Sequence, residues 1–170
     1  MSSDVITATR TYMEMTDRSA LRPAREGTSQ LSIVVVEHPT AALWRFLYTE
    51  VGRQHRWFDR LPWSDEQAQA YLDDPAISVW VASVGDETAG YFELHREADA
   101  SVEIVYFGLL PQYTGRGLGG ALLTAAVERA WENGTRRVWL HTCTFDHPAA
   151  IPNYLKRGFT VFKTEQYTVR

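Results

Sequence analysis

Glycines crowd one short stretch of this 170-residue chain, where Gly115, Gly117, Gly119 and Gly120 fall within six positions. Each glycine at a helix start costs up to about 1 kcal/mol relative to alanine, so such a run indicates that the backbone approaches something closely. A bare turn that leads into a helix presents unpaired N–H groups and a partial positive charge. The stretch therefore predicts a site for an anionic group such as a phosphate.

Two other interpretations fit the same glycines. One is a tight turn that only brings a helix close to a strand. The other is a dinucleotide fingerprint, because Gly115, Gly117 and Gly120 match G-x-G-x-x-G. The context is against the fingerprint, because hairpins precede the motif and no acid ends the next strand about twenty residues on. A P-loop is excluded, since no Gly-Lys-Ser/Thr follows the glycines.

The elements around the glycines follow from hydrophobic patterning and turn residues. Three strands at short spacing, over 77–84, 89–95 and 101–110, must form antiparallel hairpins. An apolar stripe at helical spacing predicts a helix over 118–132. A strand over 137–143 follows, which we expect to lie parallel to the 101–110 strand through a right-handed crossover.

The flanking segments complete a mixed α/β fold. We expect a buried strand over 31–37, helices that start at the caps Thr40 and Ser64, and a short helix over 148–157. The first of these helices has Ala41, Leu43, Phe46, Leu47 and Val51 as its apolar positions. Further expected features are a last strand that starts at 159 and reaches as far as 169, an arm or edge strand within 1–30, and a single domain over 31–170.

Composition narrows the class of protein. Hydrophobic residues make up 45% and charged residues 22%, as in soluble globular proteins. The net charge of −4 argues against nucleic-acid binding, and no apolar run approaches the ~20 residues of a membrane span. Cys143 is the only cysteine, and the N-terminus does not read as a signal peptide, so we expect a cytoplasmic protein.

The charge is unevenly distributed along the chain. Residues 1–112 hold nine Lys or Arg against seventeen Asp or Glu, whereas residues 113–170 hold eight against four. The basic part contains the glycine turn, which favours a polyanionic ligand there.

Two separated motifs carry a family resemblance over about residues 31–165. The segment 108–117 reads Gly-Leu-Leu-Pro-Gln-x-x-Gly-x-Gly before a helix, and the segment 153–159 reads Asn-Tyr-Leu-Lys-Arg-Gly-Phe. Both, in this order, resemble the GCN5-related N-acetyltransferase (GNAT) family. The resemblance implies a mostly antiparallel sheet that splays between the fourth and fifth family strands, with helices on both faces.

The resemblance also implies an enzyme that moves the acetyl group of acetyl-CoA to a primary amine, without a metal. We expect a small-molecule acceptor rather than a protein lysine. The alternative is a catalytically silent acyl-CoA-binding sensor or interaction module on the same fold. The sequence leaves open whether two copies form a homodimer.

Residues carried over from the family motifs form the expected cofactor site. His147 belongs to it because it stands near the position where many members have Asn, in Asp146-His147-Pro148. The expected cofactor residues are Leu109, Leu110, Gln112, Gly115, Arg116, Gly117, Leu118, Gly119, Gly120 and His147.

For catalysis, the resemblance assigns proton donation to the leaving thiolate to Tyr154. Glu103 is the expected general base, because the run 103–107 resembles the histone-acetylating branch. Glu93 and His95 are alternatives, and a water chain can also remove the proton. A metal site or a nucleophilic cysteine within 141–147 is a further reading, to which we prefer a cleft-lining role.

The acceptor pocket is expected at the loop after the first helix, which is rich in rings and cations. The alternative is a solvated loop that folds two rings onto the core. The predicted substrate residues are His55, Trp57, Arg60, Trp63 and Glu93. An aromatic-walled pocket with cations suits a small amine that also bears a carboxylate or a flat apolar group. The Glu103 resemblance favours protein lysine instead.

Overall fold

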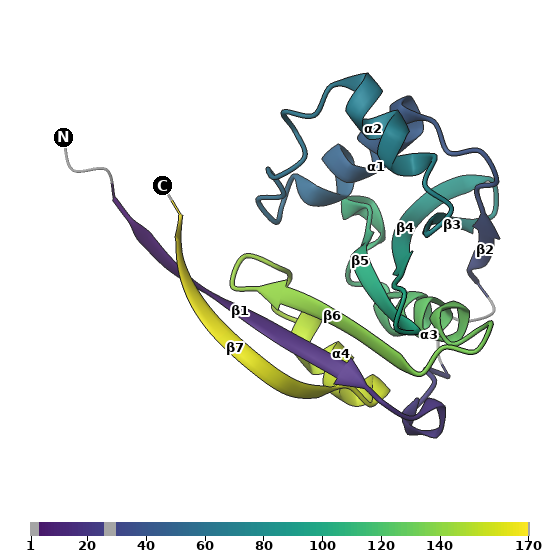
Figure 1. Cartoon of the computed structure of the whole chain (residues 1–170), viewed down its shortest axis with the longest axis vertical. Helices are drawn as coiled ribbons and strands as arrows, with labels where there is room; N and C mark the ends of the chain where they lie inside the picture. Colours follow the sequence, from purple (N-terminus) through teal and green to yellow (C-terminus); the bar gives the residue numbers. More distant parts are fainter. Residues whose placement is uncertain (1–3, 26–29, 170) are drawn as a thin grey trace.

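The hairpins and the crossover organise the sheet. The computed structural model describes residues 4–25 and 30–169. In this part of the chain seven strands form one sheet in the order β2-β3-β4-β5-β6-β1-β7 (Figure 1). The strands are β1 (Ile6–Met15), β2 (Ser32–Val35), β3 (Ile77–Val84), β4 (Glu87–Arg96), β5 (Ser101–Leu109), β6 (Arg137–Cys143) and β7 (Thr160–Val169).

Four α-helices and two 3₁₀ turns connect these strands. They are α1 (Ala41–Gly52), α2 (Asp65–Leu72), α3 (Gly119–Ala130), α4 (Ala150–Arg157), η1 (Arg18–Ala20) and η2 (Pro111–Tyr113). The predicted caps are confirmed: the Thr40 side chain accepts a hydrogen bond from Leu43 N, and Ser64 forms a capping box with Gln67. Gly158 ends α4 at φ 109°.

Strand pairing confirms the expected topology. β3, β4 and β5 pair as antiparallel neighbours, and β5 and β6, joined through α3, are parallel. The parallel register covers only Ser101–Glu103 against Arg137–Trp139. Val105 is left out of the β4–β5 register, where a bulge falls between Ile104 and Tyr106.

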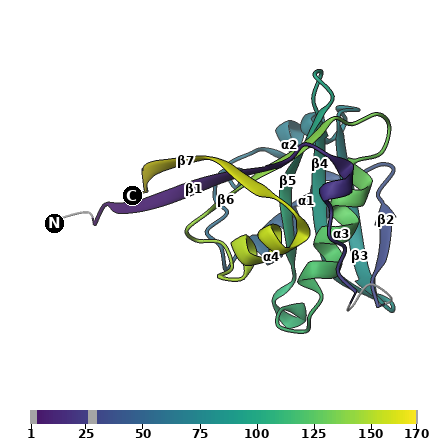
Figure 2. The ribbon, with the colours of Figure 1, turned by 90° about the horizontal axis from the view of Figure 1, so that it is seen from below.

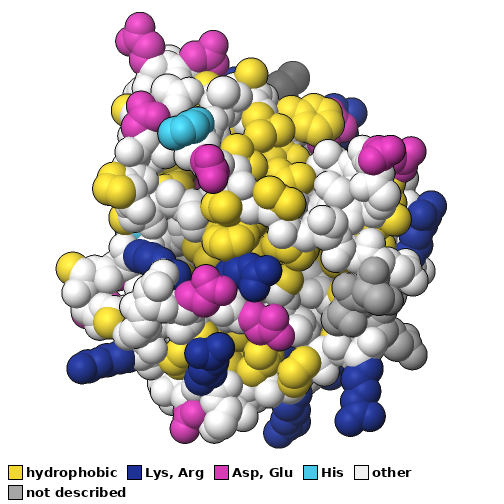
Figure 3. All heavy atoms as spheres, turned by 90° about the vertical axis from the view of Figure 1, so that its right-hand side faces the viewer, with side chains coloured by type: hydrophobic (Ala, Val, Ile, Leu, Met, Phe, Trp, Pro, Cys, Tyr) yellow, Lys and Arg dark blue, Asp and Glu magenta, His cyan; other side chains and the backbone are white. Residues whose placement is uncertain are grey.

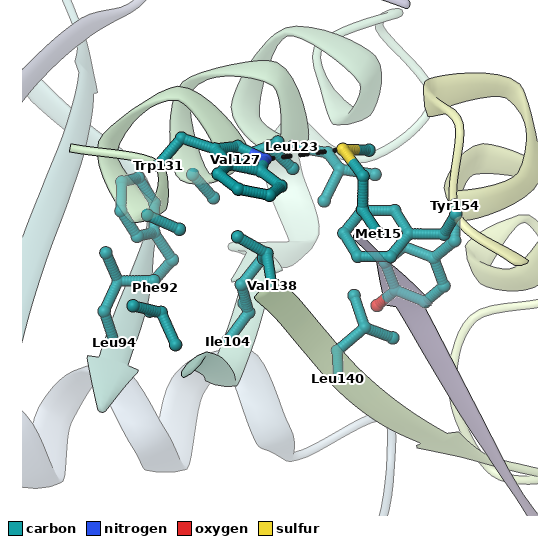
Figure 4. Close-up of a cluster of buried hydrophobic side chains, with 14 of the residues drawn as sticks. Met15, Phe92, Leu94, Ile104, Leu123, Val127, Trp131, Val138, Leu140 and Tyr154 are labelled. Atoms are coloured by element: carbon teal, nitrogen blue, oxygen red, sulfur yellow. Dashed lines mark hydrogen bonds between the residues drawn. The ribbon is translucent and has the colours of Figure 1, made fainter. Parts of the chain in front are cut away.

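Helices cover both faces of the sheet, and each face has its own core. Residues of α3 and α4 pack with Met13, Phe92 and Val138 on one face (Figures 2 and 4). Residues of α1 and α2 pack with Val79 and Tyr91 on the other. In Figure 4, Trp131 Nε1 donates to Met15 Sδ at 3.4 Å, which ties α3 to β1.

One expectation for this part of the chain is wrong. The strand predicted as buried is the edge strand β2, where Val34 is 60% exposed. Figure 3 shows hydrophobic side chains at the surface of this end of the sheet. In α1, Phe46 is 50% exposed, whereas Trp44 and Tyr48 are buried. Ala41, Leu47 and Val51 are buried on the same helix, so these two rings join the apolar positions named from the sequence.

The N-terminal segment differs from the expected arm or edge strand. β1 is an interior strand, because it pairs with β6 on one side and β7 on the other. β1 and β7 run together away from α1 and α2, and their outer ends project from the body (Figures 1 and 2). In the described part of the chain, no helix is long and apolar enough to cross a membrane.

Candidate active site

A cleft opens where β5 and β6 part. Their pairing ends at Glu103 and Trp139, but β5 continues to Leu109 and β6 to Cys143. Residues of both strands beyond this point line one cleft of about 650 Å³, together with the glycine turn, α4 and the 55–59 loop. That volume is typical of small-molecule sites.

The glycine turn forms one end of this cleft. Gly115 and Gly117 have φ of +75° and +76°, a backbone conformation that other residues adopt only with strain. No side chain in the described part of the chain caps α3 at Leu118, so its first-turn N–H groups stay available. Asn153 Nδ2 donates to Gly119 O at 3.1 Å and fixes α4 against this turn.

A cation lies beside the same turn. An added Cβ at Gly120 would come 3.5 Å from Arg157 Nη1 and 3.1 Å from Ala24 Cβ. Arg157 Nε is buried and has no hydrogen-bond partner among the described residues. Arg157 does not line the cleft, but Lys156 of the same helix does. Free backbone donors and a nearby lysine are groups that bind phosphate, so the residues present fit a phosphate-bearing cofactor such as acetyl-CoA.

Tyr154 reaches the middle of the cleft from α4. Its ring is 7% exposed and packs against Phe107 and Phe159 at centroid distances of 6.3 and 6.2 Å. In Figure 4 its hydroxyl points toward Leu140 of β6. Burial raises the pKa of Tyr154, with smaller contributions from Asp146 and Cys143, so the phenol stays protonated at neutral pH.

Glu103 and His141 face each other where β5 and β6 part. Glu103 Oε1 lies 3.8 Å from His141 Nε2. Burial raises the pKa of Glu103 to about 7, the Glu97 and Glu93 carboxylates raise it too, and Arg60 opposes them. Burial and then Arg10 lower the pKa of His141.

Two loops meet at one mouth of the cleft, away from the glycine turn. Trp57 Nε1 donates to Asp146 Oδ1 at 3.4 Å, and the Arg56 guanidinium lies 4.8 Å from the Phe145 ring centre. The His55 ring lies 6.5 Å from that of His147. These contacts join the α1–α2 connection to the β6–α4 connection and narrow the approach to the cleft.

Arg60 lies behind this mouth in an aromatic cage. Its Nη1 donates to both Glu93 oxygens, at 2.9 and 3.2 Å, and its Nη2 donates to Tyr71 Oη at 3.0 Å. Burial is the largest single effect and lowers the pKa of Arg60, but Glu93, Tyr71 and Tyr106 together outweigh it, so the pKa is raised. The guanidinium lies within 5.6 Å of the ring centres of Trp44, Trp63, Tyr71 and Tyr106.

The predicted substrate residues therefore form two groups in the structure, one that lines the cleft and one that does not. His55 and Trp57 line the cleft. Arg60 and Glu93 are buried in the cage with Trp63 beside them, and none of the three lines the cleft.

The predicted catalytic and cofactor residues also include some that line the cleft and some that do not. Tyr154 lines the cleft, and Glu103 lies behind His141. Cleft-lining cofactor residues are Leu109, Gly115, Gly117, Gly119, Gly120 and His147. Leu110 and Leu118 are buried in the α1-side core, while Gln112 and Arg116 are exposed, with Arg116 over the Tyr113 ring at 5.1 Å.

Several cleft residues were not predicted from the sequence. Arg10 of β1 and Tyr167 of β7 line its far end, where the guanidinium lies 4.6 Å from the ring centre. Only the pairing of the two ends of the chain brings them there, so no local signal could have revealed them. Among the described residues, no group of three or more His, Cys, Asp or Glu side chains is placed to hold a metal ion.

Comparison with known proteins agrees with this geometry. A mycothiol acetyltransferase of Corynebacterium aurimucosum is 29% identical over 168 residues, covering 83% of this chain and 53% of its own length. The chain thus spans about half the length of that relative. Among solved structures, a GCN5-related N-acetyltransferase from Kribbella flavida aligns with TM-score 0.65 at 16% identity, over 96% of this chain and 58% of the other.

An aminoglycoside acetyltransferase from an uncultured soil metagenomic sample, solved in complex with sisomicin, aligns with TM-score 0.61 at 16% identity. The alignment covers 76% of this chain and 88% of that one. At such identities the structural likeness shows the fold. The family model for the acetyltransferase (GNAT) family matches residues 43–159, which is more than half of the sequence. With the fold and this match in agreement, the chain belongs to the acetyltransferase (GNAT) family.

Proposed function

We propose that this chain transfers the acetyl group of acetyl-CoA to a primary amine of a small molecule. The observation that carries the proposal is the single cleft, which runs from the glycine turn past Tyr154 to His141 and Arg10. One end has the donors for a phosphate-bearing cofactor, and the other has the titratable side chains that proton transfer requires.

The chain's own residues have distinct roles in this reaction. Backbone N–H groups of the glycine turn bind the cofactor phosphates, and Lys156, which lines the cleft, adds its charge there. The cofactor supplies the acetyl thioester. Tyr154 gives its hydroxyl proton to the leaving thiolate, which suits a phenol whose pKa is raised by burial.

The mouth of the cleft favours a small acceptor over a protein lysine. Trp57 and Asp146 join the two loops above the cleft, and the aromatic surface of Trp57 and His55 lines the way in. Similarity to a mycothiol acetyltransferase and to an aminoglycoside acetyltransferase supports the same choice. We therefore expect small polar amines, amino sugars among them, to be better acceptors than basic peptides.

The test measures thiol release from acetyl-CoA with a panel of aminoglycosides, amino-acid amides and basic peptides. We expect turnover with a small amine, and a kcat about 100-fold lower for Tyr154→Phe with little change in acetyl-CoA affinity. Tyr91→Phe is the matched control. It removes another buried hydroxyl, which has no hydrogen-bond partner among the described residues and does not line the cleft.

Three results would contradict the proposal. Absence of acetyl-CoA binding removes the cofactor assignment. Binding without thiol release on any amine indicates a sensor or interaction module instead. A strong preference for basic peptides overturns the choice of a small acceptor.

A further inference from the structure

His141 occupies the point where the cleft begins. Glu103 is the last β5 residue in register with β6, and its partner there is Trp139. His141 comes two residues later, so it lies on the same face of β6 as Trp139, just beyond the end of pairing. The Glu103–His141 pair therefore spans the two strands where they separate.

The two side chains differ in access to the cleft. The His141 side chain is 39% exposed and lines the cleft. The Glu103 side chain is 15% exposed and does not line it. An amine bound in the cleft therefore meets the imidazole ring before it meets the carboxylate.

The strand β1 holds the imidazole in place. Tyr12 stands opposite His141 in the β1–β6 register, with ring centres 5.6 Å apart. The Tyr12 hydroxyl donates to Glu165 Oε1 at 2.7 Å, and Arg10 Nη1 donates to the same oxygen at 2.8 Å. The ring thus rests on a side chain that is itself fixed by hydrogen bonding, which favours a defined geometry over a mobile one.

Charged groups on every neighbouring element act on this ring. Burial lowers the pKa of His141, and Arg10 of β1 lowers it further. Asp146, Asp59 and Glu165 oppose them, from the two loops and from β7. The net direction is downward, so the imidazole is neutral at pH 7 and able to accept a proton. Glu103 faces it from β5 at 3.8 Å.

We propose that His141 is the general base that accepts the proton of the acceptor amine, and that Glu103 is its positioning residue. The inference rests on the proposed acetyl transfer and names the group that activates its acceptor. The exposed ring touches the amine, and the carboxylate behind it orients Nε2 and stabilises the imidazolium ion. The present 3.8 Å separation is the kind of long contact that tightens when the ring becomes charged.

The proton and electron balance of the step is complete. The nitrogen lone pair of the neutral amine forms the N–C bond, and the amine proton passes to His141 Nδ1. The C–S bond breaks, and its electron pair goes to sulfur, which takes the Tyr154 hydroxyl proton. Solvent then returns the proton from His141 to the Tyr154 phenolate, so the products are the amide and free thiol.

The first experiment compares His141→Gln, His141→Ala, Glu103→Gln and wild type with one accepted amine, and follows kcat, KM and acetyl-CoA affinity. We expect kcat to fall about 100-fold or more for both His141 variants and about tenfold for Glu103→Gln. Acetyl-CoA affinity stays within a factor of about three. The double variant His141→Ala/Glu103→Gln is no slower than His141→Ala, because the two side chains act as a unit.

The second experiment separates a base from a merely structural ring. Imidazole added to His141→Ala raises the rate of this variant at least tenfold. The increase becomes larger as pH rises through the pKa of free imidazole. The matched control is His38→Gln, in the segment before α1 and away from the cleft, which keeps the wild-type rate with or without imidazole.

Each contrary outcome has a distinct meaning. A His141→Ala enzyme within threefold of the wild-type rate overturns the inference and leaves the proposed function intact. Loss of activity without imidazole rescue assigns the ring to binding and also overturns it. A wild-type protein that binds acetyl-CoA but acetylates no amine overturns the proposed function, and the inference with it.

Discussion

Two buried glutamates on neighbouring strands have opposite environments. Glu93 of β4 has no exposed surface and accepts hydrogen bonds from Arg60, Tyr71 and the Trp44 indole. The Glu103 side chain of β5 is 15% exposed, and in the described part of the chain the only basic side chain close to its carboxylate is the His141 imidazole, 3.8 Å away. Burial raises the pKa of Glu103 to about 7.

The difference shows that the hydrogen-bond and ion-pair partners of an internal carboxylate, rather than its burial, decide whether it keeps its charge or exchanges a proton. Glu93 fixes the position of Arg60, whose backbone N also donates to Tyr48 Oη at 3.2 Å, and so it anchors the end of the 55–59 loop, which lines the cleft. Glu103 has no cation to hold its charge, so it can exchange a proton near neutral pH. Glu93 therefore has a structural role, whereas Glu103 has the proton exchange near neutral pH that acid–base chemistry requires.

The largest expected effect comes from breaking the Glu93 cage. Glu93→Gln leaves the Arg60 guanidinium buried without a counter-ion, so we expect the free energy of unfolding to fall by about 3–5 kcal/mol in urea titrations at pH 7. Replacement of both partners, Arg60→Met with Glu93→Met, costs less than the sum of the single changes.

The control for this prediction is Glu50→Gln, whose partner Arg53 is 67% exposed. We expect that change to stay within about 0.5 kcal/mol. A Glu93→Gln protein as stable as the control would show that the cage contributes no more than a surface pair.

The second prediction concerns stability against pH at Glu103. Its pKa is raised from 4.5 to about 7, so folding disfavours the ionised form. The stabilising contribution is present below about pH 4.5 and is lost as pH rises through 7. Glu103→Gln cannot ionise, so at pH 8 it is more stable than wild type by about 3 kcal/mol, and this advantage disappears at pH 4.

Unfolding curves at pH 4, 6 and 8 measure this advantage for both proteins. A difference that does not change with pH would contradict the prediction. A stability advantage of Glu103→Gln at pH 8, together with the slower turnover expected for the same variant, would show that Glu103 lowers the stability of the protein while it serves its function.

The smallest effect concerns Glu97, which accepts a hydrogen bond from Trp139 Nε1. Its carboxylate is the second cause of the raised Glu103 pKa, after burial. Glu97→Gln keeps an acceptor for Trp139 but removes the like charge, so the Glu103 titration moves to lower pH by about half a unit. NMR of the carboxyl carbon follows this shift. Asp86→Asn, in the β3–β4 turn at the other end of the hairpin, should leave it unchanged.

Local signals in the sequence predicted much of the fold and one end of the site. Thr40, Ser64 and Gly158 mark helix ends through contacts with their own neighbours in sequence, and the glycine turn requires its φ angles wherever the rest of the chain lies. Tyr154, which lines the cleft, belongs to a short motif that also contains Gly158. Neighbouring residues were therefore enough to select it as a candidate site residue.

Properties that depend on distant contacts could not be predicted. Arg60 was expected to be a cation of the acceptor pocket, but rings from three separate segments enclose it and turn it toward Glu93. The place of β1 inside the sheet depends on β6 and β7, and nothing in its own residues specifies those neighbours. Arg10 therefore gave no sign that it lines the cleft.

The position of β1 also sets the order in which the site can form. Arg10 and Glu165 are 155 positions apart, so the support beneath His141 closes the longest loop among the side-chain hydrogen bonds of the described residues. During synthesis β1 emerges well before β7, so it cannot pair on both sides until β7 follows. Such distant pairings fold slowly, because the entropy of loop closure is lost before the contacts compensate. A chain stalled before β7 would have its glycine turn complete, while Tyr12 beside His141 would still lack its hydrogen-bond partner Glu165.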